Sequence, residues 1–187
     1  MIKIYKDFFD SDCLEYIEEQ IKRSKNTNNL RTTYPQELGG WPHFIVHNST
    51  PVMIYDIPDN GPLTKRLSEV IDIKNEVHFM IYYWPTGSYI PWHNDGHAEF
   101  TATVYMNKFW DRDWGGLFLY EEGDKILAEV PEWNKLVIQR ETTMHSTTSI
   151  SKPYYTPKAI VGGYGYNMFP EIRTTVQIFE LKKVNNG

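Results

Sequence analysis

The stretch that decides the fold runs from residue 77 to residue 107 and reads VHFMIYYWPTGSYIPWHNDGHAEFTATVYMN. Turn residues divide it into three short runs rich in aromatic and β-branched side chains, at 77–84, 89–93 and 100–107. Short runs of this composition, bounded by proline, glycine and asparagine, are typical of β-strands. The middle of the chain is therefore predicted to form a sheet.

The run 100–107 alternates between apolar and polar side chains. One face carries Phe100, Ala102, Val104 and Met106, and the other carries Thr101, Thr103, Tyr105 and Asn107. In an ordinary half-buried strand the polar face looks at solvent. In a jelly roll it can instead point into a ligand cavity, where hydroxyl groups become hydrogen-bond donors.

The chain on either side of this stretch completes the pattern. Six further runs predict strands, at 116–120, 126–130, 135–139, 142–148, 158–167 and 173–181. Apolar residues at helical spacing predict two earlier helices, at about 11–25 and 62–72. Residues 26–60 are rich in proline and glycine and are predicted to form loops over a site, interrupted by strand-like runs at 43–47 and 52–55. About nine strands after two helices predict a mainly β (α+β) fold, a sandwich or jelly roll with the N-terminal helices packed on one face.

Length and composition predict one soluble domain. The 187 residues, 41% hydrophobic and 15% aromatic, suffice for a single core. We expect one domain over residues 1–187, with a helical and loop buttress at 1–75 and a jelly-roll core at 76–182. The net charge of −5 argues against a nucleic acid or an anionic membrane as partner.

The expected location is the cytoplasm. The first residues lack the pattern of a secretory signal, and no run approaches the ~18 apolar residues of a membrane span. The single cysteine, Cys13, cannot form an internal disulfide, which suits a reducing compartment. The sequence does not indicate an oligomeric state.

His93, Asp95 and His145 are the candidate metal ligands. Side chains two apart in a strand share a face, so His93 and Asp95 can bind one ion. His145 would have to come from a neighbouring strand. Two histidines and one carboxylate leave open coordination positions, as in non-haem Fe(II) oxygenases. His97 lies four residues after His93, as in helical zinc motifs, but Pro91 and Gly96 disfavour a helix there.

Two other functions use the same three residues. The set also suits catalytic zinc, and hence a hydrolase or isomerase. A non-catalytic jelly-roll binding module, with a structural metal and aromatic loops that recognise a polar ligand, is the other. The segment Trp110–Trp114 is either an ordinary surface loop or a rim that contacts substrate.

Several short motifs occur in an order that resembles a known family. They are YYWPTGSY at 82–89, HND at 93–95, VYMN at 104–107, GG at 115–116, VP at 130–131 and MHS at 144–146. This series, within residues 77–168, resembles the prolyl 4-hydroxylase-like branch of the Fe(II)- and 2-oxoglutarate-dependent oxygenases.

The resemblance implies a double-stranded β-helix in which His93, Asp95 and His145 bind Fe(II). It further implies 2-oxoglutarate and O2 as cosubstrates, with ascorbate as a candidate reductant. The reaction would couple decarboxylation of 2-oxoglutarate to succinate with hydroxylation of a small-molecule or peptide substrate. A peptide prolyl residue is the first expectation for that substrate.

The resemblance also suggests residues for the cosubstrate. Family members usually carry a basic residue nine to eleven positions after the second histidine, but here 154–156 read Tyr-Tyr-Thr. We assign Lys158, which opens a predicted strand, to the far carboxylate of 2-oxoglutarate, with Tyr105 as its hydrogen-bond partner. Lys152 and Arg173 are the alternatives, although Arg173 is expected to lie on a last, outer strand.

A tyrosine upstream of the first histidine faces the cosubstrate in this family. Tyr83 resembles it and is the expected residue. Tyr82 stays open as the alternative, because neighbouring strand residues face opposite ways.

Overall fold

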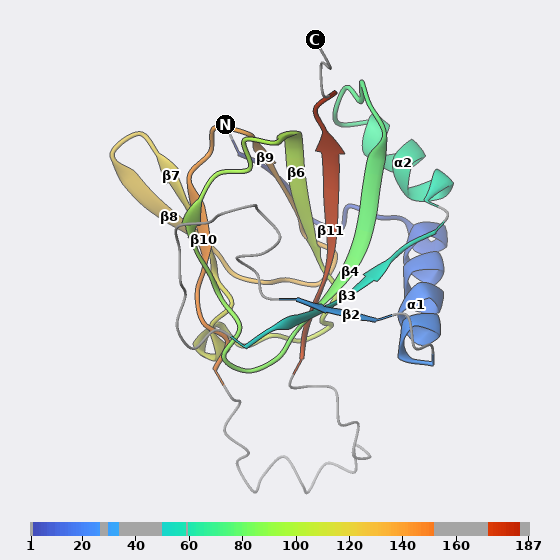
Figure 1. The fold of residues 1–187 in the computed structure, drawn as a ribbon, viewed down its shortest axis with the longest axis horizontal. Helices are drawn as coiled ribbons and strands as arrows, with labels where there is room; N and C mark the ends of the chain where they lie inside the picture. The colour runs from blue at the N-terminus through green and yellow to red at the C-terminus, as the bar shows by residue number, and fades with distance from the viewer. Residues whose placement is uncertain (1, 27–29, 34–49, 59, 152–171, 184–187) are drawn as a thin grey trace, which may run out of the picture.

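Two antiparallel sheets face each other in the computed structural model of this chain. Two helices cover the outer face of the larger sheet (Figure 1). The structure describes residues 2–26, 30–33, 50–58, 60–151 and 172–183. None of the helices in these ranges is both long enough and apolar enough to span a bilayer.

Within the described residues, the larger sheet has seven strands in the order β1-β9-β6-β11-β4-β3-β2. They are β1 (Lys3–Tyr5), β2 (Arg31–Thr33), β3 (Val52–Asp56), β4 (Val77–Trp84), β6 (Ala98–Tyr105), β9 (Leu136–Arg140) and β11 (Arg173–Leu181). The expectation of a last, outer strand is therefore half right. β11 follows every other described strand in sequence, but it lies in the middle of the sheet, between β4 and β6.

The smaller sheet has four strands in the part of the chain that the structure describes, in the order β5-β10-β7-β8. They are β5 (Ile90–His93), β7 (Phe118–Glu122), β8 (Lys125–Glu129) and β10 (His145–Thr147). A short 3-10 helix, η2 (Arg112–Trp114), precedes β7. The β7–β8 hairpin extends from the body of the molecule (Figure 1), and its Ile126 is 63% exposed.

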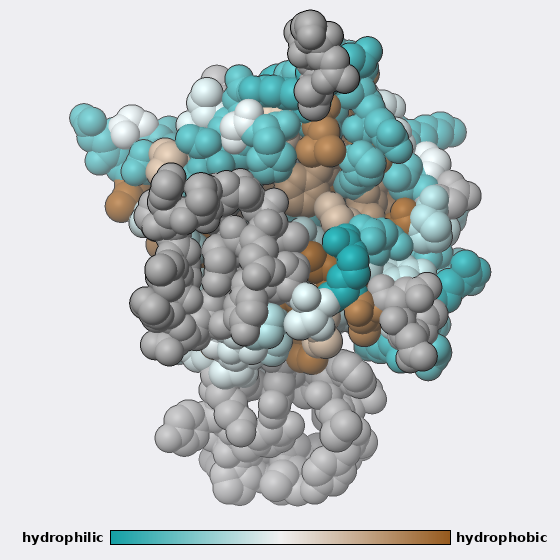
Figure 2. Space-filling model, viewed as in Figure 1, coloured by the Kyte–Doolittle hydropathy of each residue, from teal (hydrophilic) through white to brown (hydrophobic). Residues whose placement is uncertain are grey.

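On the face drawn in Figure 2, most of the described surface is hydrophilic.

The helices begin where the sequence predicts. α1 (Ser11–Lys25) is capped by Asp10, whose side chain accepts a hydrogen bond from the Cys13 amide at 2.9 Å. α2 (Gly61–Ser68) has Pro62 in its first turn and ends four residues before the predicted boundary. Both helices bury apolar side chains against the larger sheet, where they form the main core.

Strand alternation separates this core from the space between the sheets. On β6, Phe100, Ala102, Val104 and Met106, which follows its last residue, belong to the main core, as predicted. On β11, Val176 and Ile178 do the same, whereas Arg173, Gln177 and Phe179 line a pocket on the other face. β6 and β11 therefore each have one face in the core and one toward the smaller sheet.

The first 75 residues do more than buttress the sheet. β1, β2 and β3 come from this part of the chain and extend the larger sheet at both ends. The predicted strand at 158–167 lies outside the described residues.

Candidate active site

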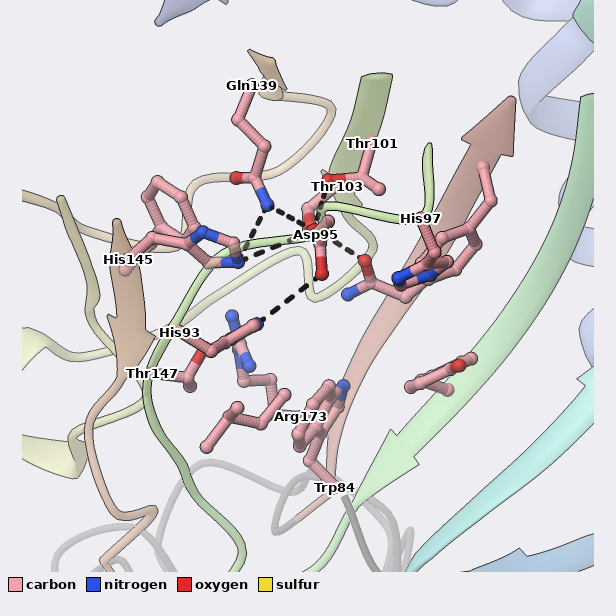
Figure 3. A pocket seen from close by; sticks show the side chains of 15 residues that line it. Trp84, His93, Asp95, His97, Thr101, Thr103, Gln139, His145, Thr147 and Arg173 are labelled. Atoms are coloured by element: carbon pink, nitrogen blue, oxygen red, sulfur yellow. Dashed lines mark hydrogen bonds and ion pairs between the residues drawn. The ribbon is translucent and has the colours of Figure 1, made fainter. Parts of the chain in front are cut away.

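A pocket between the two sheets brings the three predicted metal ligands together. His93 ends β5, Asp95 follows it, and His145 begins β10, which pairs with β5 so that His145 lies opposite His93. The Nε2 atoms of His93 and His145 each lie 3.6 Å from an oxygen of Asp95, Oδ1 and Oδ2 respectively. The three side chains offer one ligand atom each within 4.8 Å of one another, and all point into the same space (Figure 3).

The two histidines each form a hydrogen bond through Nδ1, and this bond sets the orientation of the ring. The Nδ1 of His93 donates to the Pro91 carbonyl at 2.8 Å, and the Nδ1 of His145 donates to the Thr143 carbonyl at 2.9 Å. These bonds fix the tautomer with a proton on Nδ1, so each Nε2 carries its lone pair toward the centre of the pocket. The donor set fits a divalent metal such as Fe(II).

The protonation states agree with metal binding. Burial, followed by the charge of neighbouring His145, lowers the pKa of His93 to about 4. Burial also lowers the pKa of His145. Burial alone would raise the pKa of Asp95, but attraction to the two histidines and hydrogen bonds from Thr101 and Gln139 hold it below its usual value. Neutral imidazoles and an ionised carboxylate are the forms that bind metals.

Gln139 and Thr101 surround the carboxylate of Asp95. Thr101 on β6 donates to Oδ2 at 2.6 Å, and Gln139 on β9 donates to the same oxygen at 3.0 Å. The sequence placed Thr101 on the polar face of its strand, and the structure puts that face in the pocket. The role of Gln139 was missed. Its only signal was a polar residue at the end of the otherwise apolar run Leu136-Val137-Ile138.

Arg173 is the cation that the described residues place in this pocket. Its side chain is 1% exposed, and its guanidinium carbon lies 5.2 Å from the ring centres of both Trp84 and Tyr105. Its Nε and Nη1 atoms are buried and have no hydrogen-bond partner among the described residues. Burial lowers the pKa of Arg173, but a guanidinium stays protonated at neutral pH.

The remaining candidates for the cosubstrate divide into three groups. Tyr105 is fully buried beside Arg173, and its hydroxyl has no hydrogen-bond partner among the described residues. Lys158 and Lys152 lie outside the described residues. Arg173 lines the pocket from the start of β11, in the larger sheet.

The expectation that Tyr83 faces the cosubstrate is wrong. Its ring packs in the main core, and its hydroxyl lies 2.5 Å from Ser24 Oγ on α1, on the opposite face of the sheet. The alternative, Tyr82, lines the pocket. The two residues are neighbours on β4, and strand alternation sends their side chains to opposite faces.

Two other sequence features have mainly packing contacts. His97 lines the pocket and lies against the ring of Phe179, with ring centres 6.4 Å apart, so it adds no fourth metal ligand. Trp110 is 9% exposed, donates to the Gly115 carbonyl at 2.9 Å, and packs edge-on against Trp114. Trp110 therefore anchors its loop to the body of the protein.

Comparison with solved structures identifies the architecture. A prolyl hydroxylase from Trichoplax adhaerens, in complex with a peptide fragment of the hypoxia inducible factor oxygen degradation domain, matches with a TM-score of 0.67 and 14% identity, over 96% of this chain and 83% of that one. The chain has the fold of the prolyl hydroxylases. A prolyl-4-hydroxylase from Pseudomonas putida matches with a TM-score of 0.65 and 12% identity, over 98% of this chain and 93% of that one.

A 2OG-Fe(II) oxygenase family oxidoreductase from Burkholderia pseudomallei has the same architecture, with a TM-score of 0.58 and 13% identity, over 95% of this chain and 82% of that one. No family model and no curated protein matches the sequence. The predicted jelly roll with N-terminal helices on one face is thus confirmed as a prolyl hydroxylase fold, with the His93, Asp95 and His145 cluster between its sheets.

Proposed function

We propose that this protein is an Fe(II)- and 2-oxoglutarate-dependent dioxygenase that hydroxylates its substrate. One observation carries the proposal. The buried guanidinium of Arg173 lines the same pocket as His93, Asp95 and His145, and two of its nitrogens have no hydrogen-bond partner among the described residues. A pocket that combines a candidate metal-binding triad with such a cation is suited to an anionic ligand of the metal.

The chemistry of 2-oxoglutarate matches both halves of this pocket. A buried charge without a partner is costly, so a pocket that keeps one is built for a ligand of opposite charge. One end of 2-oxoglutarate, with its carboxylate and keto oxygens, can chelate a metal, and the other end is a second carboxylate. The planar guanidinium of Arg173 would bind that second carboxylate through two parallel hydrogen bonds.

Tyr105 would complete the carboxylate site. Its buried hydroxyl, without a partner among the described residues, lies on the strand next to β11 and beside the guanidinium. Tyr82 and Trp84, from β4, would form the wall of the pocket. Lys158 remains the competing assignment for the cation, and a comparison of Arg173→Met with Lys158→Met in 2-oxoglutarate binding separates the two.

The protein's own residues would do three things in the reaction. His93, Asp95 and His145 would hold Fe(II), which supplies activation of O2 for oxidative decarboxylation and hydroxylation. Arg173 and Tyr105 would orient the cosubstrate, and the apolar walls would keep water from the reacting centre. Ascorbate would serve only to keep the iron reduced.

The proposed substrate is a prolyl residue of a peptide. The support is the likeness to the Trichoplax adhaerens prolyl hydroxylase, which was solved with a peptide bound. A small molecule is the alternative, because a shared fold is a weak guide to substrate. Incubation with a proline-rich peptide library, followed by mass spectrometry for a gain of one oxygen atom, distinguishes the two classes.

The central test is succinate formation from 2-oxoglutarate with Fe(II) under air. The wild-type protein should produce succinate above a His93→Ala control, even without the substrate, through slow uncoupled turnover. No succinate from an iron-loaded wild type would refute the proposal. Retention of zinc after anaerobic purification, with no 2-oxoglutarate binding, would favour the hydrolase or isomerase instead.

A further inference from the structure

Gln139 is a buried polar side chain that bridges two of the candidate metal ligands. It lies on β9, is 5% exposed, and places its Nε2 atom 3.0 Å from Asp95 Oδ2 and 2.8 Å from His145 Nε2 (Figure 3). These two contacts indicate that Gln139 does more than fill space beside the ligands.

The chemistry of the two contacts fixes which end of the amide faces them. Asp95 is a carboxylate, and His145 has its proton on Nδ1, so both contacted atoms are acceptors. Only the NH2 group of Gln139 can satisfy two acceptors, because its carbonyl oxygen would meet two lone pairs. The Gln139 amide therefore donates one hydrogen bond to each ligand.

Thr101 donates to the same carboxylate oxygen from β6, the strand that pairs with β9. Its hydroxyl lies 2.6 Å from Asp95 Oδ2, so this oxygen receives two donors, one from β6 and one from β9. The other oxygen, Oδ1, lies 3.6 Å from His93 Nε2, whereas Oδ2 lies 3.6 Å from His145 Nε2 and accepts both of these hydrogen bonds. The two oxygens of one carboxylate are thus in different environments.

We propose that Gln139 and Thr101 are positioning residues that restrict Asp95 to binding the metal through Oδ1 alone. The inference rests on the proposed metal site. With Oδ2 occupied by two donors, the carboxylate cannot rotate to bind with both oxygens without breaking hydrogen bonds to a charged group. Asp95 would then supply one ligand atom, and the metal would keep a position for the cosubstrates that a carboxylate bound through both oxygens would occupy.

Gln139 has a second effect that Thr101 lacks. The Nε2 of His145 has one lone pair, which the Gln139 amide uses in the metal-free protein and the metal uses when it binds. Gln139 must therefore release His145 and keep Asp95 on metal binding. Loss of Gln139 removes both a supporting contact and a competitor, whereas loss of Thr101 removes only support.

This difference gives an ordered expectation for metal affinity, measured with Mn(II) by electron paramagnetic resonance. Thr101→Val should weaken binding at least about tenfold, the usual size of such outer contacts. Gln139→Leu should stay within about threefold of wild type, because the lost support and the lost competitor offset each other. Thr101→Ser keeps the hydroxyl and should restore wild-type affinity. Thr174→Val, which removes a hydroxyl from the other face of β11, should leave affinity unchanged.

The coordination itself is tested by the visible absorption of the Co(II)-loaded protein. The Thr101→Val/Gln139→Leu double variant should show shifted d–d bands, because Asp95 is free to bind through both oxygens, and its bands should respond less to added 2-oxoglutarate. Thermal unfolding of each variant checks that it is folded, and if the double variant is not, Thr101→Val alone is compared with Thr101→Ser.

Unchanged Mn(II) affinity and an unchanged Co(II) spectrum in folded Thr101→Val would overturn the inference. A wild-type protein that binds metal with the expected ordering of variants, yet never turns over 2-oxoglutarate, would refute the proposed function and leave the positioning roles standing.

Discussion

Replacing Arg173 with methionine should weaken the binding of 2-oxoglutarate and raise the free energy of unfolding. Methionine keeps an unbranched apolar stem against the rings of Trp84 and Tyr105 but removes the charge and the donors. The substitution therefore separates the packing of this side chain from its electrostatic role.

The structure sets the size of both effects. Nε and Nη1 are buried and have no described partner, so the guanidinium can donate charge-assisted hydrogen bonds to a bound carboxylate. Their loss should cost about 3 kcal/mol, or roughly a hundredfold in the Kd for 2-oxoglutarate. In the ligand-free protein the same guanidinium is a buried charge, and its removal should raise the free energy of unfolding by about 1 kcal/mol, or about 2–4 °C in Tm.

Titration calorimetry with 2-oxoglutarate and Mn(II), paired with thermal unfolding, measures the two quantities on the same samples. Lys158→Met is the matched control and should bind 2-oxoglutarate as the wild type does. If Arg173→Met binds normally and Lys158→Met does not, the reasoning is refuted and the cation is Lys158. A large loss of stability in Arg173→Met would show that the guanidinium is satisfied within the protein.

Three further predictions address the rest of the fold. Tyr83→Phe loses the hydrogen bond to Ser24 and should lower the free energy of unfolding by about 1 kcal/mol in urea denaturation, while the Kd for 2-oxoglutarate stays at its wild-type value. Burial holds the pKa of His93 at about 4, so in the metal-free protein the unfolded chain takes up a proton before the folded one as pH falls below 6.5. The free energy of unfolding should therefore be highest above pH 6.5 and fall by up to about 3 kcal/mol by pH 4. A free energy of unfolding that does not change over this pH range would contradict the prediction. Ile178→Ala, at a fully buried position of β11, should cost about 2–5 kcal/mol by the same denaturation assay, and a loss under 1 kcal/mol would show that the core can collapse around it.

Local patterns in the sequence predicted most of the fold. The alternation of β6, the helix α1 and the strands from 77 to 140 follow from side-chain periodicity and turn residues, which act over a few positions. The place of β11 could not be predicted this way, because strand order in a sheet depends on contacts between residues far apart in sequence. Its assignment to an outer position followed from its place in the chain.

The site shows the same division. His93 and Asp95 lie two apart in one segment, so their shared direction was readable, and the structure brings His145 to them. Tyr83 was misplaced because a one-residue choice in a strand selects the face, and both faces of β4 are buried here. Arg173 was expected on an outer strand because its distance from His145 was counted along the chain, whereas the larger sheet places it in the pocket at the start of β11.

The central position of β11 also constrains how the protein can fold. β4 and β6 lie on either side of a strand that follows them by about seventy to ninety residues, so neither has its inner partner until the ribosome has released β11. Strands so far apart in sequence pair slowly. Until β11 pairs with them, the unpaired edges of β4 and β6 can form hydrogen bonds with other chains. Since Arg173 begins this same strand, the sheet and the pocket that contains this arginine would be completed in one late step, and a nascent chain without β11 should have neither.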